Sequence, residues 1–221
     1  MQPVLKLATI VSMPFQENTF IAHLEGRKDC LIVDPGFEPD RILEHLLQHD
    51  LAPAAILNTH GHSDHIAGNA TIKRQWPACP IVIGIAEAAK LIDPKLNLSA
   101  AFGAALTSPP ADVTVEDGQI YAVAGFDLEV RAIPGHSVGH VIYLWRQRQP
   151  AVAFVGDVIF AGSIGRTDFP DGNFDALAEG IRRKIFSLPN DTQLYSGHGP
   201  VTTVGEERRY NPFVGEQGEA V

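Results

Sequence analysis

The stretch from Asn58 to His65 constrains this chain more than any other, because positions 60 to 65 hold three histidines and one aspartate. Imidazole and carboxylate are the ligands that borderline and hard divalent metal ions prefer. Positions 60, 62 and 64 share parity, so in an extended loop their side chains leave the same side of the backbone. Gly61 lets the loop bend, and a turn at 63–64 can re-aim His65. Four ligands exceed what one open catalytic site needs, which indicates two ions side by side.

Length and composition favour one domain that spans residues 1–221, with a short tail at about 214–221. The chain has 221 residues, of which 45% are hydrophobic, enough for an extensive core. Its formal net charge of -9 argues against nucleic-acid and anionic-membrane partners, although it permits a local basic pocket. The sequence contains no apolar run of membrane-spanning length and no signal-peptide pattern at its start, so we expect a cytoplasmic protein. The oligomeric state stays open.

Strand-like and helix-like runs alternate along the chain. Apolar runs at 20–24, 30–33 and 54–57 are typical of strands, and the last of them leads directly into the histidine-rich loop. Helical spacing appears at 41–49, with Asp40 as its N-cap, and at 66–76, with Ser63 or Asp64 near its start. Further helices are predicted at 86–92, 174–188 and 204–209, and strands dominate 113–155. Segment 93–110 has no regular pattern and is either a pocket wall or a surface excursion. The chain is predicted to form two β-then-α halves with the helices outside.

Three later stretches each place one potential ligand in a glycine-containing turn after an apolar run. These residues are His136, Asp157 and His198. A lone histidine in a turn is usually structural. Together, however, the three residues provide the two further imidazoles and the bridging carboxylate that a paired-metal site needs.

From about Asn18 to Pro212 the sequence resembles the metallo-β-lactamase superfamily, whose signature is a His-x-His-x-Asp-His loop followed by His, Asp and His. The resemblance implies a four-layer αββα sandwich, of the α/β class, with the metal site at one edge of the two sheets. It implies that one ion is held by His60, His62 and His136. It implies that the second ion is held by Asp64, His65 and His198, and that Asp157 bridges the two.

The implied reaction is hydrolysis by a hydroxide held between two divalent ions, because metal binding lowers the pKa of water from about 15.7 to about 7. Asp64 and Asp157 would be the catalytic carboxylates, which orient and bridge. Zinc is the first choice of metal, although His and Asp ligands also accept iron or manganese. Asp34 ends a strand and is either the acceptor for a ligand imidazole's free N–H or a turn-former before Pro35. His140 is predicted to brace its loop.

Within the superfamily, residues 156–160, 165–170 and 211–213 resemble the glyoxalase-II-like hydroxyacylglutathione hydrolases and their short bacterial relatives. That resemblance implies cleavage of a small anionic thioester such as S-lactoylglutathione to a 2-hydroxy acid and glutathione. Full-length members have a C-terminal helical domain that supplies part of the glutathione site, and this chain is expected to lack it. Arg166 fits the family's basic position and is either a partner for a substrate carboxylate or a surface residue. Thr167 and Asp168 replace the aromatic side of that pattern.

Two other activities stay open on sequence grounds. The run from Gly165 to Phe169 also resembles persulfide dioxygenases, which would use a single Fe²⁺ held by His60, His136 and Asp157. Lactonases and other ester hydrolases would use the same hydroxide. Thioester hydrolysis is favoured over these two activities because the segments 163–165 and 211–213 resemble the short hydrolase branch.

Overall fold

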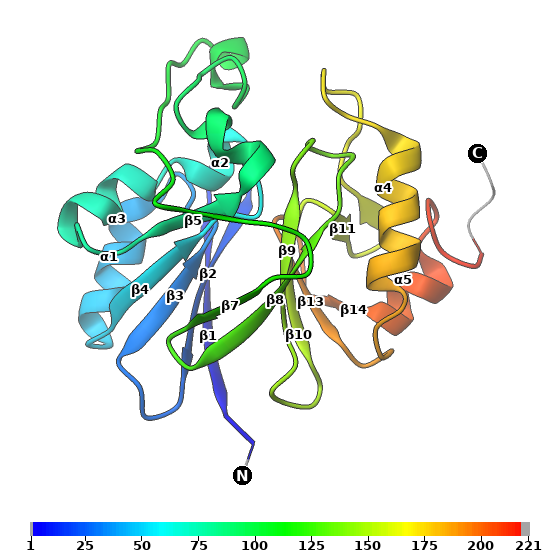
Figure 1. The fold of residues 1–221 in the computed structure, drawn as a ribbon, viewed down its shortest axis with the longest axis horizontal. Coiled ribbons are helices and arrows are strands. Elements are labelled where there is room, and N and C mark those ends of the chain that lie inside the picture. The colour runs from blue at the N-terminus through cyan, green and yellow to red at the C-terminus, as the bar shows by residue number, and fades with distance from the viewer. Residues whose placement is uncertain (1, 218–221) are drawn as a thin grey trace.

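Two six-stranded sheets pack face to face in a computed structural model that describes residues 2–217 (Figure 1). The first sheet has the order β1-β2-β3-β4-β5-β6 and is antiparallel through β3 and parallel beyond it. Its strands are β1 Leu5–Ser12, β2 Glu17–Leu24, β3 Asp29–Val33, β4 Ala52–Leu57, β5 Ile81–Gly84 and β6 Val113–Val115.

The second sheet has the order β14-β13-β10-β9-β8-β7, in which only the pair β10 and β13 is parallel. Its strands are β7 Ile120–Val123, β8 Phe126–Ala132, β9 Val141–Trp145, β10 Val152–Gly156, β13 Gln193–Ser196 and β14 Thr202–Thr203. A separate short hairpin joins β11 Ile159–Phe160 to β12 Ser163–Ile164.

Helices cover the outer face of each sheet, as Figure 1 shows. The first sheet carries α1 Pro39–Gln48, the short α2 Ser63–Ile66 and α3 Asn69–Gln75. The second sheet carries α4 Phe174–Gly180, the π-helical turn η3 Ile181–Ile185 and α5 Val204–Tyr210. Two 3₁₀ helices, η1 Ile85–Leu91 and η2 Ser99–Phe102, follow β5.

Alternation along the strands explains the layering. In β3, Leu31 and Val33 pack into the core between the two sheets, whereas Cys30 and Ile32 pack against α1. Trp145 and Tyr143 of β9 fill the inter-sheet core from the other side and are fully buried. The predicted αββα sandwich with outside helices is therefore confirmed.

Several predicted boundaries were wrong. Helix α1 begins at Pro39 with Glu38 as N-cap, so Asp40 lies inside the first turn rather than at the cap. The helix predicted at 66–76 is divided into α2 and α3, and His62 is the residue that precedes α2. The division falls at Gly68, where a Cβ would lie 2.9 Å from the Cβ of Pro35.

Other segments also differ from prediction. The helix predicted at 86–92 is the 3₁₀ helix η1, and the helix predicted at 174–188 changes to π geometry after Gly180. Strand β1 was not predicted. Of the predicted tail at about 214–221, residues 218–221 lie outside the described part of the chain. Cys30 and Cys79 are both free thiols. Within residues 2–217, every helix is too short or too polar to cross a membrane.

Candidate metal centre

The four ligand-type stretches meet at one edge of the two sheets, because each follows or precedes a strand that ends there. The histidine-rich loop follows β4, His136 lies between β8 and β9, Asp157 follows β10 and His198 follows β13. Backbone hydrogen bonds join these loops, between the two sheets from Val141 N to Thr59 O at 2.9 Å and within the second sheet from Gly197 N to Gly156 O at 2.8 Å. The two sheets thus fix the loops relative to one another.

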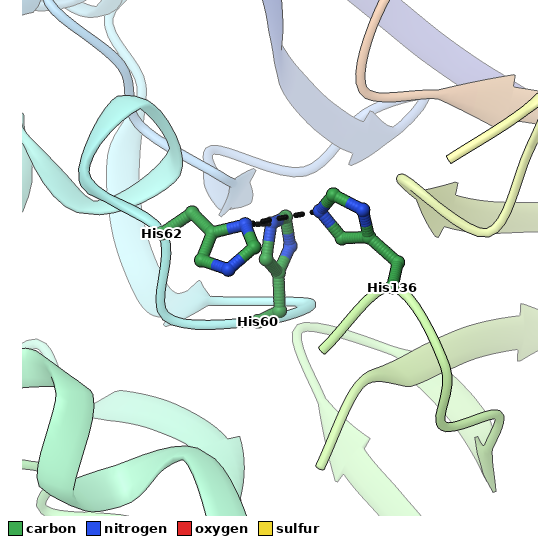
Figure 2. A group of neighbouring side chains, drawn as sticks. All are labelled: His60, His62 and His136. Carbon is green, nitrogen blue, oxygen red and sulfur yellow. Dashed lines mark hydrogen bonds between the residues drawn. The ribbon is translucent and has the colours of Figure 1, made fainter. Parts of the chain in front are cut away.

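Three imidazoles form the first group. Nδ1 of His62 lies 3.0 Å from Nε2 of His60 and 3.0 Å from Nε2 of His136, and Figure 2 shows the three rings turned toward one another. Burial lowers the pKa of all three side chains, so they are neutral at physiological pH. Two ligands at 2.0–2.1 Å from one tetrahedral ion lie about 3.3 Å apart, so the group fits a single ion.

Asp64, His65 and His198 form the second group. Nε2 of His65 lies 3.8 Å from Oδ2 of Asp64, and Nε2 of His198 lies 3.6 Å from the same oxygen. Burial opposes the charging of His198, but the carboxylates of Asp157 and Asp64 outweigh it and raise the pKa of His198 to about 10. A proton there occupies the place that a metal ion takes when it binds.

Asp157 lies between the two groups. Its Oδ2 is 3.5 Å from Nε2 of His136 and 3.4 Å from Nε2 of His198, and its Oδ1 is 3.4 Å from Nε2 of His65. Both Oδ1 of Asp157 and Nε2 of His65 are buried without a hydrogen-bond partner among the described residues. A cation bound between these two atoms would satisfy both of them. The structure therefore brings together all seven residues that the sequence singled out.

Neighbouring groups orient the imidazoles through their second ring nitrogens. His136 donates from Nδ1 to the carbonyl of Arg166 at 2.8 Å, and His198 donates from Nδ1 to the carbonyl of Phe15 at 3.0 Å. A carbonyl only accepts, so each ring carries a proton on Nδ1 and turns Nε2 toward the centre. His140 holds the loop of Asp157 rather than its own loop, because its Nε2 accepts the backbone N–H of Asp157 at 3.1 Å.

Asp34 supports the second group from behind. Its two carboxylate oxygens accept the backbone N–H and the hydroxyl of Thr59, each at 2.7 Å. Oδ2 also lies 3.2 Å from Nδ1 of His65. The carboxylate thus lies beside a ligand imidazole, and its role as acceptor for that ring's N–H stays a prediction.

A buried network on η1 was missed by the sequence analysis. The carboxylate of Glu87 accepts the backbone N–H of Gly61 at 2.8 Å, the hydroxyl of Ser137 at 2.5 Å and the N–H of Gly139 at 2.7 Å. Lys90 lies 3.5 Å from that carboxylate and donates to Asp171 at 2.5 Å. Glu87 thus ties the loop of His60 and His62 to the loop of His136, and no local motif signals it.

A cavity of about 330 Å³ opens over both groups. Much of its wall is apolar, and those residues are Phe15, Leu98, Phe102, Phe160, Ile164 and Phe169. Segment 93–110 therefore supplies part of the wall, which was one of the two roles considered for it. Arg166 also lines the cavity, but its Nε and Nη2 lie 2.7 Å from the two carboxylate oxygens of Asp168. Its guanidinium is thus paired within the chain.

Comparison with known proteins agrees with the fold. The family model described as "Metallo-beta-lactamase superfamily" matches residues 13–198. The chain is 35% identical over 207 residues to "Hydroxyacylglutathione hydrolase GloC" of Haemophilus influenzae, covering 90% of this chain and 93% of the relative. It is 38% identical over 203 residues to "Probable metallo-hydrolase YqgX" of Bacillus subtilis, covering 91% and 93%.

Solved structures of other proteins have a similar fold. The crystal structure of "BLEG-1 B3 metallo-beta-lactamase" has a TM-score of 0.89 at 36% identity, over 95% of this chain and 99% of that one. The structure of "TTHA1623 in a di-iron-bound form" has a TM-score of 0.80 at 34% identity, over 93% and 99%. On the family match, the identities and the fold, the chain belongs to the metallo-beta-lactamase superfamily of metallo-hydrolases.

Proposed function

We propose that this chain is a dinuclear metal-dependent thioesterase that hydrolyses an acyl thioester such as S-lactoylglutathione to a 2-hydroxy acid and glutathione. The observation that carries the proposal is the gathering of two ligand groups around one shared carboxylate, that of Asp157. The similarity to the Haemophilus influenzae hydroxyacylglutathione hydrolase supports the choice of a thioester.

Each residue group has a distinct role in this proposal. His60, His62 and His136 would hold one ion, the residues Asp64, His65 and His198 would hold the other, and Asp157 would contact both. Two bound divalent ions supply a water of lowered pKa and polarise the substrate carbonyl. Zinc is the first candidate, and iron is supported by the di-iron relative. The ligand set accepts either metal.

Asp64 would orient the attacking water. Its side chain lines the cavity and keeps some exposure to solvent, unlike the fully buried His65. Burial opposes ionisation, but the neighbouring imidazoles of His65 and His198 lower the pKa of Asp64. At neutral pH it is therefore a carboxylate, whose oxygen can accept a hydrogen bond from water and align a lone pair toward the carbonyl carbon.

Metal content per chain tests the proposal against the persulfide dioxygenase alternative. We expect about two ions per chain by elemental analysis, and about one in His198→Ala, with a loss of thioester hydrolysis of about 100-fold or more. His49→Ala, an exposed histidine at the C-terminal end of α1, is the matched control and should keep both ions. A single iron that persists in His198→Ala, together with oxygen uptake on glutathione persulfide, would overturn the proposal.

Ligand truncation gives a second readout. His60→Ala and Asp157→Ala should each abolish hydrolysis, because His60 belongs to the first group and Asp157 to both. Full activity in either variant would exclude the dinuclear centre as the catalytic site.

A further inference from the structure

Aromatic rings flank the candidate metal centre on both sides. The ring of Phe169 packs edge-on against His62, with centroids 5.1 Å apart, and against His136 at 5.8 Å. On the other side, the ring of Phe160 packs edge-on against His198 at 5.9 Å. A group bound between the two ligand groups would therefore have an aromatic ring on either side.

The outer part of the cavity is apolar as well. Phe15 and Phe102 contact each other edge-to-face, with centroids 5.6 Å apart, and both are partly exposed to solvent. Leu98 continues this wall at the start of η2. Side chains of this kind bind other apolar groups by removing their surface from water, and aromatic partners add a preference for ring edges and faces.

Free positive charge is scarce in the same cavity. Among its lining residues, all within the described part of the chain, Arg166 is the only lysine or arginine. Its guanidinium is held in a bidentate pair by Asp168 and lies 4.3 Å above the ring of Phe169. A glutathione thioester carries two carboxylates. A carboxylate that approaches this guanidinium must share it with Asp168, against the repulsion between like charges.

We infer that the cavity selects substrates by uncharged, apolar groups on both sides of the scissile carbonyl, and not by the carboxylates of glutathione. The inference rests on the proposed thioesterase activity, and it ranks thioesters with an aryl or other apolar acyl group above S-lactoylglutathione, whose acyl group carries a hydroxyl, as substrates. The thiol half of the substrate then needs no charged group for recognition.

Four thioesters test this inference in a two-by-two design. Acetyl and phenylacetyl groups are each attached to glutathione and to uncharged N-acetylcysteamine. We expect phenylacetyl to raise kcat/KM by about tenfold or more over acetyl with either thiol. Removal of the glutathione carboxylates should change kcat/KM by less than about threefold. A preference of about tenfold or more for the glutathione thioesters would overturn the inference.

Binding is measured in parallel with thioether analogues, in which a methylene replaces the carbonyl. Calorimetry on the metal-loaded protein compares the phenylethyl thioethers of the two thiols with their ethyl counterparts. If neither S-lactoylglutathione nor any of the four thioesters is hydrolysed, the thioesterase proposal fails. Tighter binding of the phenylethyl compounds, independent of the thiol, would still support an apolar site, and equal or weaker binding would refute it.

Two variants locate the selectivity. Phe102→Ala should lower the phenylacetyl-to-acetyl ratio of kcat/KM by about three- to tenfold, whereas Ile92→Ala, a similarly exposed residue outside the cavity, should leave the ratio unchanged. Asp168→Asn frees the guanidinium of Arg166 and should raise the glutathione-to-N-acetylcysteamine ratio by about threefold or more. An unchanged phenylacetyl-to-acetyl ratio in Phe102→Ala, or an unchanged thiol ratio in Asp168→Asn, would contradict the inference.

Discussion

At the scale of single residues, Asp34 supports the metal ligands without being one of them. The φ angle of Asp34 is 49°, in the left-handed region that asparagine tolerates better than most residues. Asp34→Asn therefore removes the charge beside His65 without adding backbone strain. We expect divalent-ion affinity to fall about 10- to 100-fold, because the free N–H of a ligand imidazole loses its carboxylate partner.

A competition titration with a chromophoric chelator measures this effect. Asp50→Asn is a matched control, because Asp50 has a φ of 52° but an exposed side chain far from the ligands. Equal metal affinity in the two variants would show that His65 does not depend on Asp34.

At the scale of elements, the 3₁₀ helix η1 serves as the brace between two ligand loops. Glu87 is fully buried and accepts three hydrogen bonds, from the loops that carry His62 and His136. A Cβ on Gly61 would lie 2.5 Å from the Cβ of Lys90, so the loop and the helix are in close contact. The arrangement explains how short, irregular loops can hold three imidazoles at fixed spacing.

Replacement of Glu87 by glutamine tests this brace. Glutamine keeps the shape and one acceptor oxygen, but loses the charge that faces Lys90. We expect the free energy of unfolding to fall by about 1.5–3 kcal/mol, the usual contribution of hydrogen bonds to a charged group. Metal release to a chelator should also be faster. Denaturant titration measures the unfolding free energy and stopped-flow measures the rate of metal release, both for Glu87→Gln and for the surface control Glu116→Gln. Equal stability and equal release rates in the two variants would rule out the brace.

The same element shows where sequence reasoning ends. The ligands were predictable because each stands at the end of an apolar run, and that signal is local. Glu87 and Lys90 stand within a run that was interpreted simply as a helix, and their partners lie 26 to 81 positions away along the chain. The break between α2 and α3 has a similar origin, since Gly68 stops the helix where its backbone meets Pro35. The pairing of Arg166 with Asp168 depends on side-chain orientations that the motif leaves open.

At the scale of the whole molecule, the two sheets bring six imidazoles close together at one edge. Burial lowers the pKa of His60, His62, His136 and His140, so the unfolded chain binds protons that the folded chain does not. This difference exists below the usual histidine pKa of about 6.5. The stability of the metal-free protein should therefore fall as the pH decreases below about 6.5. Burial raises the pKa of Glu17, so the folded chain binds one proton there that the unfolded chain does not, and this compensates for only one of the four histidine protons.

The remaining two imidazoles act in the opposite direction. Although burial opposes it, nearby carboxylates raise the pKa of His65, and they raise that of His198 to about 10. The folded chain keeps these protons when the unfolded chain has released them, so their contribution is complete below about pH 6.5 and is lost as the pH rises toward 10. We expect the denaturation midpoint in excess chelator to reach a maximum near neutrality. Saturating zinc should suppress the alkaline decline, because the ion replaces both protons. A midpoint that rises steadily to pH 9 in chelator would show that these histidines are neutral in the folded chain, and would remove the electrostatic basis for a second cation at Asp64 and Asp157.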